Sequence, residues 1–338
     1  MSGSTQIMAF HVSQKHLFYT EIAKLLEAGF GIREAAASML DTKLPTAQAG
    51  LLEEMDRELE AGKSIAESFD STNSMISPLE RSVIGAGERG GRMAAAFQHL
   101  ADYYGMLAAA RREALRAMVY PMVLLHMGIF VGVLAPALMK GDSTMYEIVT
   151  RFVVTMLGVY LVGFLVFLGV RGLLATVPNS APLDRFVSRI PVIGGALRAM
   201  AMARFTKVYH IGLLAGLSMK ETVETAARAS RSGVVSAAAK RLTATLESNG
   251  PLGPEFIASG AFPKAFARSY STAEESGGLD KDMARWSLVY QDDAAKAVRT
   301  LSTVTAKVGT FLVMLFVAWT ILRVFSGYYG MIDDVLNE

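Results

Sequence analysis

Three long apolar stretches interrupt a chain whose apolar residues otherwise recur at the spacing of a helix. Two of these stretches carry no formal charge over about 20 residues, the length that a helix needs to cross a bilayer. The third is shorter, but Lys307 and Arg323 at its ends have long stems whose charges can reach the headgroups. We therefore predict transmembrane helices at 117–139, 152–175 and 304–326.

The remaining chain is predicted to form helices throughout. In the first segment, residues 1–116, apolar side chains such as Phe18 and Ile22 recur with helical spacing, and the alternation typical of strands is absent. Short breaks rich in glycine and proline favour small antiparallel bundles. The second segment, 176–303, repeats this order, and its proline-bounded start at 178–191 is interpreted as a linker. The predicted fold class is an all-α membrane protein with two homologous cytoplasmic helical-bundle domains and three transmembrane helices.

The two bundles repeat one another at an offset of 187 residues. The pairs related by this offset include Phe18 with Phe205, Gly29 with Gly216, Phe69 with Phe256, Glu88 with Glu275, Gly90 and Gly91 with Gly277 and Gly278, and Tyr103 with Tyr290. An apolar run follows each copy at the same distance. We therefore interpret the chain as one module, a bundle followed by a span, that occurs twice.

The distribution of lysine and arginine predicts the orientation in the membrane. Basic residues gather before the first span, after the second and before the third, and such flanks are typically cytoplasmic. The short loop 140–151 and the acidic tail 327–338 lack this excess. We expect the N-terminus and both bundles in the cytoplasm, with the loop and the C-terminus on the periplasmic side.

A repeated pair of acidic, glycine-rich corners is the strongest functional pointer outside the spans. The corner residues are Glu88, Gly90 and Gly91 in the first copy and Glu275, Gly277 and Gly278 in the second. One interpretation is a helix stop, in which glycine ends the helix and the glutamate caps nearby amides. The other is a docking surface for a partner, or a divalent-cation site completed by a second carboxylate.

The first span holds several residues that set helix packing. Gly128 and Gly132 form a small-xxx-small face that can bring another helix close. Pro121 and Pro136 are expected to bend the two ends of the span. His126 is expected to satisfy backbone carbonyls within the helix bundle, with a proton relay as the alternative.

Composition and motifs argue against catalysis and nucleic-acid binding. A formal net charge of +2 does not provide the concentrated basic surface that nucleic acids require. The chain has no cysteine, and its five histidines lack the spacing of a metal site. Lys63 belongs to a Gly-Lys-Ser triplet, but the preceding glycine of a phosphate-binding loop is missing. We expect no cofactor, no metal and no enzymatic activity.

The order of these motifs resembles a known family. An N-terminal Leu-Leu-Glu-Ala-Gly ending at Gly29, a Gly-Glu-Arg-Gly-Gly at 87–91, a membrane hairpin, a Leu-Leu-Ala-Gly ending at Gly216, a Glu-Ser-Gly-Gly at 275–278 and a final span follow one another. This sequence is similar to the inner-membrane platform proteins of type II secretion systems and type IV pili. Its compact length is more like that of type IVb-like systems.

The resemblance implies a non-enzymatic assembly component of the bacterial inner membrane. Its partners would be a cytoplasmic assembly ATPase, pilin or pseudopilin subunits, other inner-membrane assembly proteins, the lipid bilayer and further copies of the same chain. The corner residues, with Gly29 and Gly216, would determine the fold or the docking of partners. Two alternatives stay open: a membrane signalling scaffold unrelated to pili, and a transporter of small solutes, for which only His126 supplies a polar group within a span.

Overall fold

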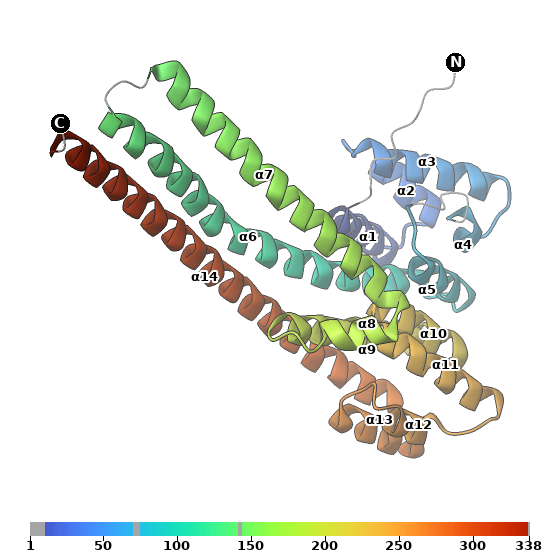
Figure 1. The fold of residues 1–338 in the computed structure, drawn as a ribbon. Helices are drawn as coiled ribbons and strands as arrows, with labels where there is room; N and C mark the ends of the chain where they lie inside the picture. The colour runs from blue at the N-terminus through green and yellow to red at the C-terminus, as the bar shows by residue number, and fades with distance from the viewer. Residues whose placement is uncertain (1–10, 70–74, 141–143, 337–338) are drawn as a thin grey trace. The chain divides into compact units, whose positions relative to one another are not determined.

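The computed structural model of the chain describes residues 11–69, 75–140 and 144–336, and these residues form helices without any strand (Figure 1). The helices in chain order are α1 (Val12–Glu27), α2 (Ile32–Leu40), α3 (Thr46–Glu60), α4 (Ile65–Ser68), α5 (Pro78–Arg89), α6 (Met93–Lys140), α7 (Met145–Thr176), the 3₁₀ helix η1 (Val177–Asn179), α8 (Ala181–Val187), α9 (Ile193–Ala215), α10 (Met219–Ser230), α11 (Gly233–Glu247), α12 (Leu252–Ser259), α13 (Lys264–Ser276) and α14 (Leu279–Leu336). The predicted all-α fold class is confirmed.

Two compact units make up the chain. The bundle unit comprises Met1–Arg111 and Val177–Ala297, and the span unit comprises Arg112–Thr176 and Val298–Glu338. Both predicted bundles therefore belong to one unit, and their buried side chains form one continuous core that includes Phe97 of the first bundle. The division of these bundles into two homologous domains stays a prediction.

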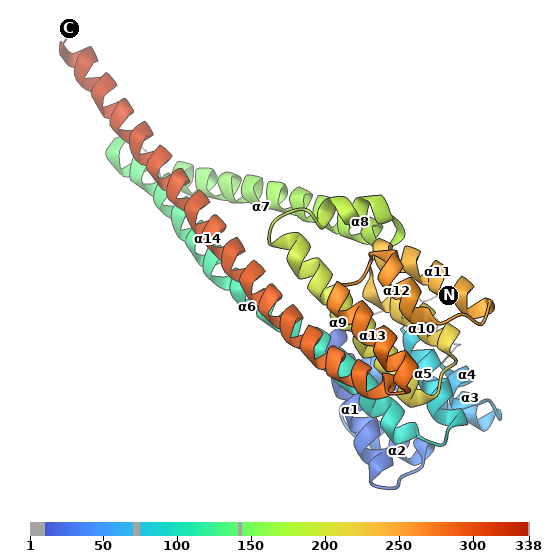
Figure 2. The same cartoon turned by 90° about the horizontal axis from the view of Figure 1, so that it is seen from below.

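Three helices are long and apolar enough to cross a membrane, over Met93–Leu134, Met145–Leu173 and Leu279–Trp319, and this bears out the three predicted spans. The predicted boundary between residues 116 and 117 lies inside α6, which continues without a break. The same holds for α14 at residue 304. Figures 1 and 2 show α6 and α14 running side by side along the span unit.

The end of the first long helix of each bundle confirms the repeat. The amide of Gly29 donates to the Leu26 carbonyl and the amide of Phe30 to the Leu25 carbonyl, with Gly29 at φ 94°. The corresponding turn after α9 is built on Gly216 at φ 74° and has the same two hydrogen bonds, each 187 residues further along the chain. This is the arrangement in which glycine closes a helix C-terminus.

The repeat loses one residue after Phe69 and Phe256. From the start of α5 onward the structural counterparts are 186 residues apart, because Ser77 and Pro263 are the N-caps of α5 and α13. In the helices that follow, equally buried counterparts are Phe97 with Met283, Tyr104 with Tyr290 and Ala108 with Ala294. The predicted pairing of Tyr103 with Tyr290 is therefore wrong by one residue.

The two copies stabilise equivalent core positions with different chemistry. In the first copy, Lys15 Nζ lies 2.7 Å from Glu80 Oε2, and the Tyr19 hydroxyl donates to Glu80 Oε1 at 2.5 Å. The Glu80 carboxylate is fully buried, and the burial raises the pKa of the Tyr19 phenol. In the second copy the positions of Lys15 and Glu80 are taken by buried Met202 and Phe266. One bundle core thus contains a satisfied ion pair, and the other is apolar there.

The segment predicted to be a linker forms a helix instead. Ser180 caps α8, since its hydroxyl accepts a hydrogen bond from the Leu183 amide, and Pro182 occupies the first turn, where its missing N–H costs nothing. Asp184 fixes α8 to the start of α11 by accepting hydrogen bonds from the Ser232 hydroxyl and the Val234 amide. Pro182 thus begins a helix inside the predicted linker, while Pro178 lies in η1 and Pro191 in the turn before α9.

Candidate functional site

Glu88 of the first corner caps a neighbouring helix. Its carboxylate accepts hydrogen bonds from the amides of Ile65 at 2.7 Å and Ala66 at 3.1 Å, the first two residues of α4. These amides have no partner within their own helix, so the carboxylate satisfies them and complements the positive end of the helix. The half-buried Glu88 side chain therefore connects α5 to α4.

Glu274 holds the same position in the second corner. It accepts from the amides of Leu252 at 2.9 Å and Gly253 at 2.7 Å, which begin α12. Glu275, the residue that the sequence register paired with Glu88, is exposed. The structural partner of Glu88 is Glu274, because the repeat is one residue shorter in this region.

The glycines of the corners shift in the same way. Gly91 at φ 64° and Gly277 at φ 73° have the left-handed conformation that favours glycine, and they follow α5 and α13. Gly90 is a helical C-cap at φ −88°, whereas the Gly278 amide donates to the Ala273 carbonyl. Gly91 therefore corresponds to Gly277, and the two doublets overlap by only one residue.

The corners have the geometry of helix stops closed by a carboxylate cap. Among the residues that the structure describes, no three histidine or acidic side chains stand close enough together to hold a metal ion. The Glu88 and Glu274 carboxylates already accept two amides each. The exposed side chain of Glu275 has no such engagement among the described residues, so it is the acidic group that faces solvent at these corners.

Within the span unit, Gly128 lies against α14. A β-carbon added to Gly128 would be 3.0 Å from Val313 Cγ1, and one added to Gly309 would be 3.1 Å from the Pro121 ring. Glycine on each helix thus permits the close approach of α6 and α14. Gly132 is half-buried, and the side chain of Pro136 lies outside the described residues.

His126 joins two spans through a partner that the sequence did not indicate. One ring nitrogen, Nδ1, lies 2.6 Å from the Met122 carbonyl, in line with the expectation that it satisfies the helix backbone. The other, Nε2, shares a 2.6 Å hydrogen bond with the hydroxyl of Tyr160 on α7. A polar aromatic residue in the second apolar run was the available signal for this pair, because an isolated hydroxyl in a span needs a partner.

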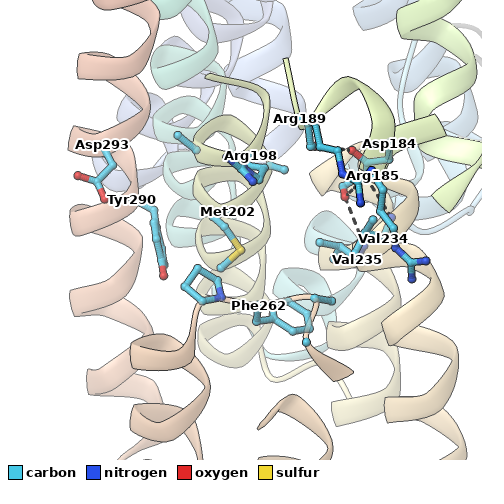
Figure 3. Close-up of a pocket in the computed structure, with 17 residues that line it drawn as sticks. Asp184, Arg185, Arg189, Arg198, Met202, Val234, Val235, Phe262, Tyr290 and Asp293 are labelled. Carbon is cyan, nitrogen blue, oxygen red and sulfur yellow. Dashed lines mark hydrogen bonds between the residues drawn. The ribbon is translucent and has the colours of Figure 1, made fainter. Parts of the chain in front are cut away.

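A cavity of about 660 Å³ opens in the bundle unit beside α8 (Figure 3). Its walls come from α8, the turn into α9, the start of α11, the turn before α13 and the adjacent part of α14. Arg185, Arg189 and Arg198 line it together with apolar side chains that include Met202 and Phe262. In the sequence these arginines are recognisable only as part of the basic flank after the second span, because the cavity brings together residues more than a hundred positions apart.

The chain is a helical membrane protein in which a module, a bundle followed by a span, occurs twice. The span on α7 lies between the two copies. The sequence model of one family matches twice, at residues 18–139 and 205–327, and each match contains one bundle and the span that follows it. The chain belongs to this family, which is described as "Type II secretion system (T2SS), protein F". The double match independently confirms the repeat.

Individual relatives agree with the family assignment. The chain is 23% identical to the type 4 fimbrial assembly protein PilC of Pseudomonas putida over 85% of its own length and 76% of that protein. It is 27% identical to the type II secretion system protein F of Pseudomonas aeruginosa over 82% and 73% of the two chains. It is 22% identical to the type IV pilus assembly protein PilC of Thermus thermophilus over 85% of its own length and 74% of that protein.

Proposed function

We propose that this chain is the non-enzymatic inner-membrane platform of a type II secretion or type IV pilus assembly machine. The observation that carries the proposal is the double family match, in which each copy combines a bundle with a span. The names of the similar proteins connect them to fimbrial assembly, pilus assembly and secretion. A protein that joins a folded helical unit to three apolar helices suits the attachment of an assembly machine to a membrane.

The proposed mechanical role is to couple a cytoplasmic ATPase to the insertion of pilin or pseudopilin subunits. Helices α6 and α14 begin in the bundle unit and continue into the span unit without interruption. An α-helix resists bending because its backbone hydrogen bonds run along its axis, and sharp kinks need a specific cause such as proline. A force that displaces the bundle would therefore act on the third span through α14, which contains no proline, whereas Pro121 and Pro136 are points at which α6 can bend.

The proposed topology has the N-terminus and the bundle unit in the cytoplasm and the C-terminus in the periplasm, as the basic flanks favour. A reporter fused after Glu338 that is active only in the periplasm should give signal, and a reporter restricted to the cytoplasm should be silent there. The opposite result would reject the orientation without affecting the family assignment.

Docking of the ATPase is proposed to involve the exposed faces of the two corners. The outward groups there are Glu275 and the neighbouring Gly277, together with Gly90 and Gly91 of the first copy, all exposed. The Glu88 and Glu274 carboxylates would contribute by holding these corners in shape. Charge reversal at Glu275 should weaken ATPase association while leaving the amount of inserted protein unchanged.

The deciding experiment is isolation of the intact complex. The tagged chain is expressed in its own host, solubilised in mild detergent after cross-linking, and its companions are identified by mass spectrometry. We expect a cytoplasmic ATPase, pilin or pseudopilin subunits and further copies of the chain. A correctly inserted chain that repeatedly purifies without any of these would reject the platform role, and a signalling partner in their place would favour the scaffold alternative.

A further inference from the structure

The arginines beside α8 are unpaired cations around one cavity. Arg185, Arg189 and Arg198 are exposed, and no hydrogen bond or ion pair connects their guanidinium groups to another described side chain. Figure 3 shows Arg185 and Arg189 at the side of the cavity that α8 forms, with Arg198 on α9 next to them. Three such groups within one cavity offer many N–H donors to an anion.

The two acidic residues of the cavity do not neutralise this wall. Asp184 is 5% exposed, and its oxygens accept from the hydroxyls of Ser188 at 3.2 Å and Ser232 at 2.5 Å and from the Val234 amide at 3.0 Å. Its carboxylate is thus engaged in fixing α8. Asp293 lies on α14, across the cavity from Arg185 and Arg189 (Figure 3).

A strained turn brings the arginines together. Between Arg189 and Arg198 the chain reverses at Val192, which has φ 66° and ψ −55°, while the Ile193 amide donates to the Pro191 carbonyl at 2.7 Å. These angles and this hydrogen bond define a γ-turn of the rare form with positive φ, which is unfavourable for a β-branched residue and is found mainly where the surrounding structure maintains it. The reversal lets α8 and α9 line one cavity.

The arginine wall is an addition to the duplicated module. The two family matches end at residue 139 and resume at residue 205, so α8, the turn and Arg198 lie between them. The opposite wall, which includes Tyr290, belongs to the second copy. The arginine wall is therefore a feature of the segment between the two matches, and the wall opposite it is built from the second copy.

We propose that this cavity binds a phosphate group carried by a partly apolar molecule. Planar guanidinium groups match phosphate oxygens in pairs of parallel hydrogen bonds, and Met202, Val235 and Phe262 supply apolar contact beside them. The volume lies within the usual range for small-molecule sites. The phosphate could belong to a soluble phosphate compound or to an anionic phospholipid. A phospholipid is a candidate because Arg185 follows the end of the apolar helix α7 at Thr176 by only nine residues. The site does not depend on the platform role.

The test uses the full chain and separates the two sources. In one arm, detergent-solubilised protein is titrated with inorganic pyrophosphate by calorimetry. In the other, protein reconstituted in phosphatidylcholine vesicles with or without phosphatidylglycerol is extracted, and retained lipid is counted by native mass spectrometry. The variant R185Q/R189Q/R198Q is compared with K43Q/K240Q/K281Q, which removes three exposed positive charges elsewhere in the bundle unit.

We expect saturable binding in one arm, at least about tenfold weaker in the arginine variant and within about twofold of wild type in the lysine variant. D293N should bind more tightly than wild type, because it removes the opposing negative charge. Binding in the calorimetric arm alone identifies a soluble phosphate compound, and lipid retention alone identifies the phospholipid. Absence of binding in both arms, or equal loss in the two triple variants, overturns the proposal. Equal thermal midpoints of all variants exclude misfolding as the cause.

Discussion

Gly253 on α12 packs directly against Ser271 on α13. A β-carbon added to Gly253 would lie 2.5 Å from the Ser271 hydroxyl oxygen and 2.6 Å from its α-carbon. In the first copy the small residue is on the other helix, where Gly85 of α5 faces Ala66 of α4 and an added β-carbon would be 3.2 Å from the Ala66 β-carbon. The repeat therefore keeps a close helix contact while glycine changes sides.

The substitution G253A is expected to destabilise the bundle unit by about 1–3 kcal/mol, because overpacking forces the two helices apart. Adding S271G should recover part of this loss, since it removes the side-chain atoms but leaves the α-carbon in place. Thermal unfolding of wild type, G253A and G253A/S271G in the same detergent measures the effect. Stability of G253A equal to wild type would show that α12 and α13 can separate freely.

Breaking the buried ion pair is expected to cost much more than replacing it. K15M leaves the fully buried Glu80 carboxylate without its cation and should destabilise the protein by about 3–5 kcal/mol. The triple variant K15M/Y19F/E80M makes these positions apolar and should recover most of that loss, since the second copy buries Met202 and Phe266 in place of Lys15 and Glu80. Denaturant unfolding of the two variants and wild type provides the comparison. Equal losses in both would mean that the pair itself supplies the stability.

The corner carboxylates are expected to differ in their contribution to folding. E88A and E274A each leave two helix amides without their partner, and each should cost about 0.5–2 kcal/mol. E275A should change stability by no more than about 0.5 kcal/mol, because its side chain is exposed. Thermal midpoints and membrane abundance distinguish the three variants. A loss in E275A comparable to that in E274A would contradict the register described for the second copy.

Stability is expected to fall as the pH decreases through the histidine range. Burial, and then the nearby Lys207 charge, lower the pKa of both His99 and His210, while Asp102 and Asp280 have a smaller opposing effect. The unfolded chain titrates near its ordinary value of about 6.5, so below that pH it binds more protons than the folded chain. The stabilisation is present above pH 6.5 and declines below it. The thermal midpoint of wild type should drop between pH 7.5 and 5.5 more than that of H99Q/H210Q, and parallel curves would exclude these groups.

Long uncharged runs made the spans predictable, because few other structures accommodate them. The helix-ending pair Gly29 and Gly216 was also recognisable, since glycine and its flanking leucines recur together. The register of the corners was not, because the lost residue falls between Phe69 and Ser77 and the glycine doublets still align by chance at the longer offset. The amides bound by Glu88 and Glu274, together with the positive φ of Gly91 and Gly277, reveal the true correspondence.

The cavity beside α8 was beyond sequence reasoning for a different reason. Its arginines are separated from Tyr290 by about ninety residues or more, and nothing in their spacing marks them as a group. The helix α8 was missed because proline was taken as a sign of irregular chain, although Ser180 followed by Pro182 is also a helix start. Whether such a segment forms a helix or an irregular linker depends here on Asp184, which accepts hydrogen bonds from Ser232 and Val234 at the start of α11.

The difference between the two cores also disfavours misfolded states in which a helix of one bundle packs into the other bundle. Two related bundles on one polypeptide offer each helix a wrong partner of nearly the right shape. If α1 packed against α13 in place of α5, Lys15 would be buried beside Phe266 without a carboxylate to accept its hydrogen bonds. The converse exchange would bury Glu80 against Met202. Each mismatch leaves a charge desolvated and unpaired, so the difference between the copies discriminates the correct assembly from a swapped one while the protein folds.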